Sequence, residues 1–380
     1  MRLSKGLEIE MYTGTSDGQI VGLSERIVKD LEGFVREPDS RNVEYTTAPL
    51  SSYDRLLCAT LQPRHNLRKY LQRIGNFTLI PGSTLSLGNS DYFCRSDLHN
   101  PYHSYIEETY GTKVVTASIH INIGINDPET LIRACRLIRL EAPLYLALSA
   151  SSPFLDGQVT GYHSTRWHLF PQTPEHVPLF KSHGHFVSWT EEQLARQTMQ
   201  NIRHLWTSVR PNGDNRPYNL NRLELRICDL IVEPIALLSV VAFLEARLIQ
   251  LIDEPNLDPL IHSQLSPDEL LTITADNEKV VAKDSLTAQL THWQDGRRID
   301  AQSWIQELYQ EILPTAKQRG FSCFLNPVKR ILRDGNLAQQ WLRKYQSGCP
   351  ISLILAQEIE AVAKLEQELE DKLCQSLLVA

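Results

Sequence analysis

Four short segments in which apolar and polar residues alternate most constrain how this chain can fold. They span residues 7–12 (LEIEMY), 42–49 (NVEYTTAP), 114–125 (VVTASIHINIGI) and 222–229 (RLELRICD). Because successive side chains on a strand point to opposite faces, each segment predicts a strand with one face against a core. Strands of a parallel sheet are buried on both faces and read as continuous apolar runs, so the alternation favours an antiparallel sheet.

Helical patterns separate the predicted strands. Asp127 and Pro128 read as an N-cap followed by the first residue of a helix. Thr190 with Gln193 is typical of a capping box and predicts that another helix begins there. Helices interspersed with half-buried strands indicate an α+β fold in which the helices cover one face of the sheet.

The chain divides into two predicted regions. Residues 1–255 hold the sheet-and-helix core, and residues 256–380 read as helical throughout and pack on the same domain. The most apolar segment, residues 235–252, contains Glu245 and Arg247. Charges in so short a segment make a membrane span costly, so it predicts a buried helix.

Charge and the N-terminal sequence narrow the class of protein. The first residues, MRLSKGLEIEMYTG, carry charges throughout and lack the apolar block of a signal peptide, so we expect a cytoplasmic protein with no membrane partner. A formal net charge of -7 and a pI near 6.0 lack the basic excess of nucleic-acid binders. The charge therefore favours a protein that acts on small molecules over one that binds nucleic acid.

The polar faces of the predicted strands carry an unusual set of side chains. A single Glu on a strand is most often part of an ordinary solvated face. If these strands share one sheet, however, the carboxylates converge, and converging carboxylates raise one another's pKa unless cations lie among them. A set of carboxylates with one imidazole suits Mg²⁺ or Mn²⁺ better than Zn²⁺. Two or more such ions beside an arginine would form a binding site for a polyphosphate group. The set consists of Glu8, Glu10, Glu44, His120, Asn122, Glu224 and Arg226.

Other motifs carry less information. The stretch 81–91 (PGSTLSLGNSD) is not a P-loop, and the chain has no Rossmann G-x-G-x-x-G, so a nucleotide would be held by a different architecture. His183 and His185 have no third partner in the sequence nearby, and we expect that neither is a metal ligand.

Taken in order, several blocks of this sequence resemble the glutamate-cysteine ligases of plants and cyanobacteria and, more distantly, the bacterial carboxylate-amine ligases. The resemblance covers about residues 5–345. It implies a glutamine-synthetase-like fold, in which a curved antiparallel sheet has helices on its outer face and holds metals, ATP and glutamate on its concave face. The blocks are G-x-E-x-E (6–10), NVEYTTAPL (42–50), ASIHINIGI (117–125), SSPFLDGQVTGYHSTRWHLF (151–170), NRLELRICD (221–229) and RGFSCFLNPVKRILRDG (319–335).

The resemblance also implies metal ligands. Glu37 precedes Glu44 by seven residues, where the bacterial relatives carry an acidic ligand, and Asp39 competes with it for that role. His120 resembles a metal-site histidine of the bacterial enzymes, where the plant enzymes have Gln. The metal-binding glutamates of the family fall on Glu8, Glu10, Glu44 and Glu224.

Three further residues match substrate-binding positions of the family. Asn122 resembles an amide on the substrate side, and Arg166 resembles the arginine that grips the glutamate substrate. Arg226 resembles one that meets phosphate or the substrate carboxylate, so it is expected to bind the nucleotide and, with Glu224, to act in catalysis.

The implied reaction is an ATP-dependent ligation of the glutamate γ-carboxylate to the amine of cysteine through γ-glutamyl phosphate, the first step of glutathione biosynthesis. Mg²⁺ or Mn²⁺ is the implied cofactor, and glutamate, cysteine and ATP are the implied partners of a monomer or homodimer. Two alternatives remain: a carboxylate-amine ligase with a different amine acceptor, and a non-catalytic relative that binds ligands.

Overall fold

A central antiparallel sheet of seven strands organises the molecule. The computed structural model describes residues 2–374, and the sheet comprises β1 (Lys5–Thr15), β2 (Phe34–Arg36), β3 (Asn42–Thr46), β4 (Phe77–Ile80), β5 (Ile119–Gly124), β8 (Val209–Asn212) and β9 (Arg222–Leu225). The strand order is β2-β3-β1-β5-β9-β8, and β4 pairs with β1. The four segments singled out by their alternation therefore lie in one sheet, and the predicted antiparallel α+β fold is confirmed.

The alternation along β1 decides which face of the sheet joins the core. Leu7, Ile9 and Met11 are at most 3 % exposed. Glu8 and Glu10 lie between them and therefore point to the opposite face. The buried isoleucines of β5 repeat this pattern, so both strands bring polar side chains to the same face.

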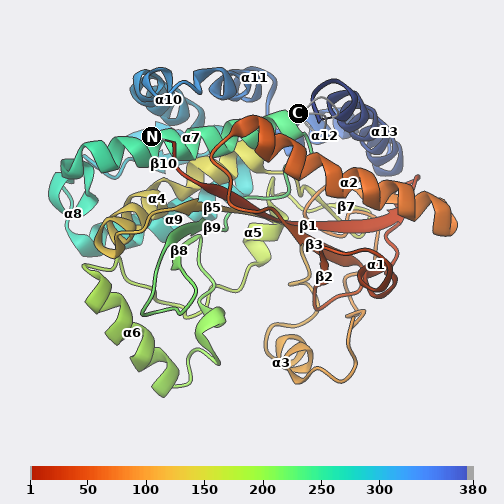
Figure 1. Cartoon of the computed structure of the whole chain (residues 1–380), viewed down its shortest axis with the longest axis horizontal. Coiled ribbons are helices and arrows are strands. Elements are labelled where there is room, and N and C mark those ends of the chain that lie inside the picture. The colour runs from red at the N-terminus through yellow and green to blue at the C-terminus, as the bar shows by residue number, and fades with distance from the viewer. Residues whose placement is uncertain (1, 375–380) are drawn as a thin grey trace.

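Helices lie on both sides of the sheet. They are α1 (Ser24–Asp30), α2 (Tyr53–Gly75), α3 (Pro101–Tyr110), α4 (Pro128–Ser149), α5 (Thr165–Leu169), α6 (His183–Ala195), α7 (Pro234–Asp253), α8 (Pro259–His262), α9 (Pro267–Asp284), α10 (Ala301–Gln318), α11 (Asn326–Asp334), α12 (Leu337–Gln346) and α13 (Ile351–Leu369). Helices α2 and α4 contact the sheet, and α7 contacts both of them. On the opposite side, α3 and α6 flank a face that the other helices leave open (Figure 1).

Two helix starts test the capping signals. Asp127 caps α4 as predicted, because its side chain accepts a hydrogen bond from the Thr130 backbone amide. The capping box at Thr190 is wrong: α6 begins earlier, with Ser182 as its N-cap. Thr190 is buried inside that helix, where its hydroxyl donates to the Phe186 carbonyl instead.

Helix α7 is the apolar segment expected to be buried. It is the one helix among the described residues that is long and apolar enough to cross a membrane, with a mean hydropathy of 2.0. Inside the protein, however, 83 % of that window is buried. Its two charges are satisfied internally, since Glu245 pairs with Lys5 and Arg247 pairs with Glu141.

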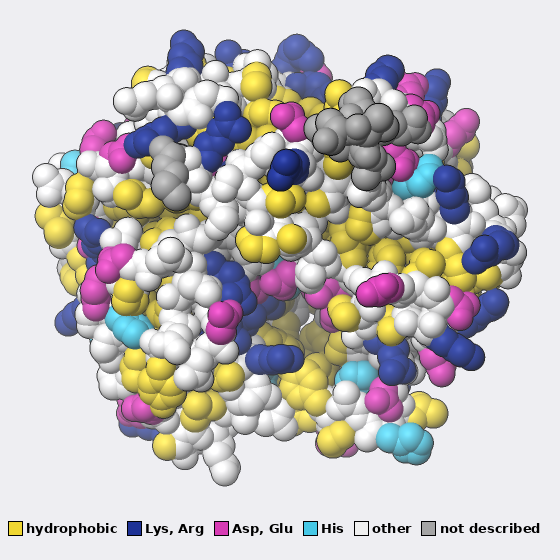
Figure 2. Space-filling model, in the orientation of Figure 1, with side chains coloured by type: hydrophobic (Ala, Val, Ile, Leu, Met, Phe, Trp, Pro, Cys, Tyr) yellow, Lys and Arg dark blue, Asp and Glu magenta, His cyan; other side chains and the backbone are white. Residues whose placement is uncertain are grey.

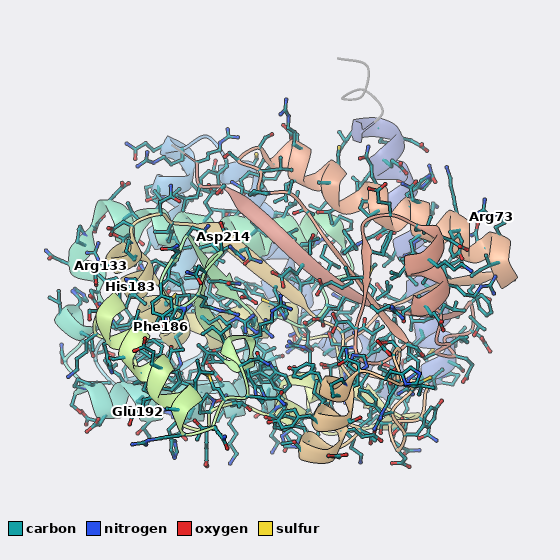
Figure 3. The ribbon with its side chains drawn as sticks, turned by 60° about the horizontal axis from the view of Figure 1, so that its bottom comes forward. Arg73, Arg133, His183, Phe186, Glu192 and Asp214 are labelled. Carbon is teal, nitrogen blue, oxygen red and sulfur yellow. The ribbon has the colours of Figure 1, made fainter. Side chains whose placement is uncertain are left out.

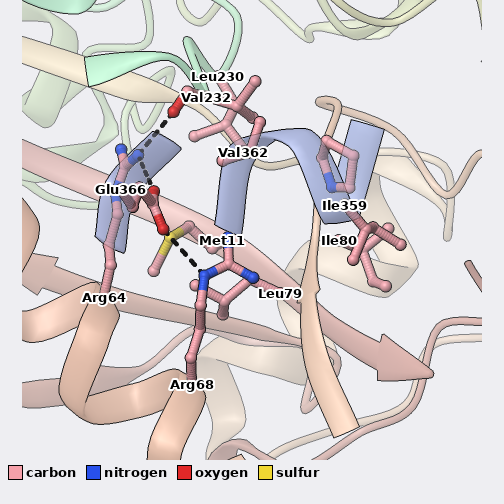
Figure 4. Close-up of a pocket in the computed structure, with 11 residues that line it drawn as sticks. Met11, Arg64, Arg68, Leu79, Ile80, Leu230, Val232, Ile359, Val362 and Glu366 are labelled. Atoms are coloured by element: carbon pink, nitrogen blue, oxygen red, sulfur yellow. Dashed lines mark hydrogen bonds and ion pairs between the residues drawn. The ribbon is translucent and has the colours of Figure 1, made fainter. Parts of the chain in front are cut away.

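The C-terminal helices pack against the core. Glu366 on α13 accepts hydrogen bonds from two arginines of α2, at 3.0 Å from Arg64 Nη1 and 2.9 Å from Arg68 Nε (Figure 4). Arg64 is 2 % exposed, and its Nη1 also donates to the Val232 carbonyl. These contacts connect the last long helix to the helix that backs β1 and β4, whereas a division of the chain near residue 255 stays a prediction.

One part of the C-terminal region is not helical. The expectation of helices throughout is wrong at β10 (Gln289–Thr291) and β11 (Arg298–Asp300), which form a hairpin. Asp295 and Gly296 lie in the connecting turn, and Gly296 has a φ of +74°, which favours glycine. This Asp-Gly pair was the sequence signal for the turn.

A second short hairpin joins β6 (Phe154–Leu155) and β7 (Gln158–Val159).

Candidate functional site

The open face of the sheet forms one wall of a cavity of about 470 Å³. Its lining includes Glu8, Glu10, Glu37, Glu44 and His120. Figure 2 shows a hollow near the centre of the view with acidic and basic side chains at its rim. In Figure 1 this region lies below the sheet, between α3 and α6.

The register of the strands brings the predicted site residues together. Glu8 on β1 lies opposite His120 on β5, and Glu10 lies opposite Glu44 on β3. One strand further on, Asn122 of β5 lies opposite Glu224 of β9. Because all these positions share the polar face, side chains that are up to 216 residues apart in sequence meet on one surface.

Glu8, His120 and Glu224 form the first acidic group. Each offers a ligand atom, and these atoms lie within 4.8 Å of one another. His120 Nδ1 is 3.0 Å from Glu8 Oε2 and 3.8 Å from Glu224 Oε1. Burial by itself raises the pKa of Glu8, but its hydrogen bond to His120 and the charge of that ring bring the pKa below its ordinary value.

Glu10, Glu37 and Glu44 form the second acidic group, also with ligand atoms within 4.8 Å. Burial, and then the charge of Glu10, raise the pKa of Glu37 to about 8. Burial, and then the charge of Glu37, raise the pKa of Glu44 to about 9. Three carboxylates this close repel one another, and a cation among them would remove that repulsion.

The structure brings Glu37, and not Asp39, into the second group. Both carboxylate oxygens of Asp39 accept hydrogen bonds from Arg41, at 2.8 Å and 2.7 Å. Asp39 Oδ2 accepts a further bond from the backbone amide of Cys94. Asp39, which competed with Glu37 for the role of metal ligand, therefore holds the loop that follows β2 in place.

Glu224 is fully buried and strongly hydrogen bonded. Arg210 on β8 donates to both of its oxygens, at 2.7 Å and 3.0 Å, and Arg226 Nη1 donates to Oε1 at 2.5 Å. Asn212 on β8 donates to Oε2 at 2.7 Å. Burial raises the pKa of Glu224, but the charges of Arg210 and Arg226 outweigh it and hold that pKa well below the ordinary value.

Arg210 and Asn212 contact a residue of the candidate site, Glu224, and sequence reasoning missed them. They stand two residues apart on β8, which is the spacing that puts two side chains on one face of a strand. Pro211 between them obscured this signal, because proline is rarely found inside a central strand. Here β8 is the edge strand of the sheet, where proline is tolerated.

Arg166 lines the same cavity but is almost entirely buried, with 2 % of its surface exposed. Its Nη1 donates to the carbonyl of Ile227 at 3.1 Å, and its Nη2 donates to the carbonyl of Arg226 at 3.0 Å. Its Nε has no hydrogen-bond partner among the described residues. The guanidinium therefore supports the end of β9, and its predicted grip on glutamate stays a prediction.

His183 and His185 lie apart from both acidic groups, in the first turn of α6. His183 Nε2 is 2.9 Å from the carbonyl oxygen of Pro217, and His185 Nδ1 accepts a hydrogen bond from the Lys181 amide. Both imidazoles thus have partners that connect α6 to neighbouring loops.

The donor set suits a hard divalent cation. The carboxylates of Glu8, Glu10, Glu37 and Glu44 line the cavity with the imidazole of His120, and Glu224 lies behind them in the first acidic group. Oxygen-rich sets of this kind hold Mg²⁺ or Mn²⁺ in proteins. The raised pKa values of Glu37 and Glu44 show the electrostatic cost of the second group without a cation. The residues present therefore fit one metal at each acidic group.

Sequence comparisons identify the family of this chain. The model of the glutamate-cysteine ligase family 2 matches residues 4–365. A Sorangium cellulosum protein named "putative glutamate–cysteine ligase 2" is 29 % identical, over 60 % of this chain and 58 % of its own length. A Rubrobacter xylanophilus relative with a similar name is 24 % identical over 90 % of both chains. A Solibacter usitatus relative with the same name as the Sorangium protein is 27 % identical over 64 % of this chain and 61 % of its own length, so the chain spans about three fifths of the length of these two relatives.

Solved structures share the fold. A bifunctional glutathione synthetase from Pasteurella multocida superimposes with a TM-score of 0.74 at 14 % identity, covering 98 % of this chain and 53 % of that one. A glutamate–cysteine ligase from Francisella tularensis, in complex with AMP, gives a TM-score of 0.70 at 13 % identity, covering 99 % and 94 %. At these identities the similarity concerns the fold alone.

Proposed function

Because this chain belongs to the glutamate-cysteine ligase family 2, we propose that it is an ATP-dependent ligase that joins the glutamate γ-carboxylate to the amine of cysteine, the first step of glutathione biosynthesis. The observation that carries the proposal is the pair of acidic groups on the open face of the sheet, beside the cavity, within a family match that spans residues 4–365. Glutamate, cysteine and ATP are the proposed partners, and the cytoplasm is the proposed location.

The reaction needs activation because a carboxylate does not react with an amine at neutral pH. A γ-carboxylate oxygen of glutamate attacks the terminal phosphorus of ATP, the bond from that phosphorus to ADP breaks, and ADP leaves. The amine nitrogen of cysteine then attacks the acyl carbon, inorganic phosphate leaves, and the nitrogen loses a proton. The side chains act by positioning and by charge, and none has to serve as a nucleophile.

The acidic groups and Arg226 have different proposed roles in this reaction. Glu8, His120 and Glu224 would hold one divalent cation, and the second group would hold another. Bound there, the cations would neutralise charge that develops on the phosphates during transfer. Arg226 is fixed against Glu224 beside them, which positions its guanidinium for a phosphate or a substrate carboxylate.

A different amine acceptor is the second candidate. The cavity is also lined by apolar and aromatic side chains, including Phe93, Ile106, Phe170 and Trp206. Such a surface would accept amines that are larger or more apolar than cysteine. In that case the chemistry is the same and the acceptor changes.

One assay separates the two candidates. Purified protein is incubated with ATP, Mg²⁺, glutamate and a panel of amino acids and apolar amines, while ADP release and product mass are followed. The proposal expects ADP release that requires both Mg²⁺ and glutamate and is fastest with cysteine. Faster turnover with another amine would move the assignment to that acceptor, and no ADP release with any amine would contradict catalysis.

A further inference from the structure

A second cavity, of about 320 Å³, lies among the helices on the other side of the sheet. Its walls come from the last turn of α4, the start of α7, and helices α11, α12 and α13. In Figure 1, α7, α11, α12 and α13 lie above the sheet, away from α3 and α6. Figure 3 brings the opposite side forward, where α6 carries His183, Phe186 and Glu192. Among the described residues, the two cavities have no lining residue in common.

Much of the lining of this second cavity is apolar. It includes Leu148 at the end of α4, Ile231 and Val232 before α7, Ile331 on α11 and Leu365 on α13. Sites for small molecules typically have volumes of about 300–1,000 Å³ and combine apolar walls with a few polar groups. The size and the walls of this cavity therefore suit the apolar body of a small organic molecule.

The charged side chains of the lining do not balance. Three of them are carboxylates, those of Glu233, Asp334 and Glu358, and Arg330 is the one cation. Arg330 forms an ion pair with Glu233, and Asp334 lies 2.7 Å from Arg333 Nε. Glu358 on α13 forms no ion pair with any cation among the described residues. One negative charge in the cavity is thus left without a partner.

Glu358 has a neutral neighbour in place of a cation. Trp341 Nε1 on α12 donates a hydrogen bond to Glu358 Oε2 at 3.4 Å. Burial raises the pKa of Glu358, and the bond from Trp341 and the charge of Lys344 offset this only in part. Ionising a carboxyl group in such surroundings costs free energy, which a cation inside the cavity would recover.

We propose that this cavity binds a primary amine with an apolar body, whose ammonium group pairs with the Glu358 carboxylate. One unbalanced negative charge matches one ammonium group, and the apolar walls match the rest of the ligand. A metal ion fits less well, because it requires several oxygen ligands and would leave the apolar walls uncovered. The inference does not rest on the proposed ligase function, since the two cavities are separate.

Calorimetry with phenethylamine tests the site, and phenethyl alcohol is the matched neutral ligand, with a hydroxyl in place of the ammonium group. Saturating Mg²⁺ and constant ionic strength reduce the attraction of the amine to the acidic groups of the other cavity. Wild-type protein should bind one molecule of phenethylamine per chain. The alcohol should bind more weakly, because it gains only the burial of its apolar body.

Glu358→Gln should raise the Kd for phenethylamine ~10-fold or more, which corresponds to about 1.4 kcal/mol. Its Kd for phenethyl alcohol should equal that of the wild type. The variant should fold, since the amide oxygen can still accept the hydrogen bond from Trp341. Glu360→Gln is the control, because Glu360 is an exposed residue of the same helix, and its Kd for the amine should not change.

If Glu358→Gln does not fold, Ala236→Leu serves instead. Ala236 lines the cavity at the start of α7, so the added methyl groups would take up space that the ligand needs, and both Kd values should rise. The site is contradicted by wild-type protein that does not bind phenethylamine, or by an unchanged Kd in the substituted protein. An equal rise in Glu360→Gln, or an equal rise for the alcohol in Glu358→Gln, would contradict the pairing of the ammonium group with Glu358.

Discussion

Glu10 connects the two acidic groups at the scale of single residues. It belongs to the second group, its Oε1 lies 3.9 Å from His120 of the first, and its Oε2 accepts a hydrogen bond from Ser118. A change at this position therefore affects both expected metals.

Glu10→Gln should lower turnover by at least ~100-fold, because loss of a metal-binding charge removes ~3 kcal/mol of transition-state stabilisation. Steady-state ADP release at saturating Mg²⁺ measures this. Glu192→Gln is the control, since Glu192 is an exposed residue of α6 that pairs with Arg196, and its turnover should match the wild type. A Glu10→Gln protein with near-normal rates would remove this residue from the site.

Arg166 combines a structural contact with a proposed substrate contact. Arg166→Lys should lower the free energy of unfolding by ~1–3 kcal/mol, because lysine lacks the planar fork whose two nitrogens reach the Ile227 and Arg226 carbonyls, so a buried carbonyl would lose its partner. The grip on glutamate further predicts a ~10-fold higher KM for glutamate with little change in the KM for ATP.

Denaturant titration and steady-state kinetics measure the two effects of Arg166→Lys separately. A loss of stability with an unchanged glutamate KM would leave Arg166 a purely structural role. A raised KM for ATP alone would show that the side chain faces the nucleotide.

At the scale of elements, the pairing of β1, β2 and β3 determines how stability depends on pH. Glu37 and Glu44 have folded-state pKa values of about 8 and about 9, above the ordinary value of 4.5. Between pH 4.5 and these values the folded state binds more protons than the unfolded state. Stability therefore falls as the pH rises through this window, by up to ~1.4 kcal/mol per pH unit for each group.

Melting curves of the metal-free protein should consequently show a falling Tm from about pH 6 to pH 9. Saturating Mg²⁺ or Mn²⁺ should reduce this slope, because a bound cation stabilises the ionised carboxylates. Glu44→Gln should reduce it in the absence of metal. A flat Tm profile, or a slope that neither metal nor Glu44→Gln changes, would contradict a cation site between these strands.

At the scale of the whole molecule, one buried ion pair joins the start of the chain to the central helix. Lys5 Nζ on β1 lies 2.8 Å from Glu245 Oε2 on α7, and both side chains are fully buried. Glu245 also accepts hydrogen bonds from Tyr53 on α2 and from the Leu3 backbone amide. The Glu245 carboxylate of α7 therefore connects strand β1 and helix α2.

Glu245→Leu should lower the free energy of unfolding by ~3–5 kcal/mol, because the charge of Lys5 would stay buried without the carboxylate that balances it. Chemical denaturation measures this cost. The double variant Lys5→Met, Glu245→Leu should recover part of the loss, since no charge is then left unpaired. A double variant no more stable than Glu245→Leu would show that the hydrogen bonds from Tyr53 and Leu3 dominate.

Which residues share a face of the sheet could be read from the order of the amino acids. Period-two alternation depends on neighbouring residues only, so it correctly assigned Glu8, Glu10 and His120 to the polar face of predicted strands. Local chemistry likewise identified the cap of α4 and the buried character of α7. The order of the blocks indicated the family, which the match over residues 4–365 confirms.

The tertiary structure alone decided which of these residues meet. Strand order and register bring Glu44 beside Glu10 and place Arg210 against Glu224. No local pattern contains this information, because pairing between distant segments depends on the packing of the whole chain. The charge balance of the site, and with it the pKa values of Glu37 and Glu44, therefore follows from the fold.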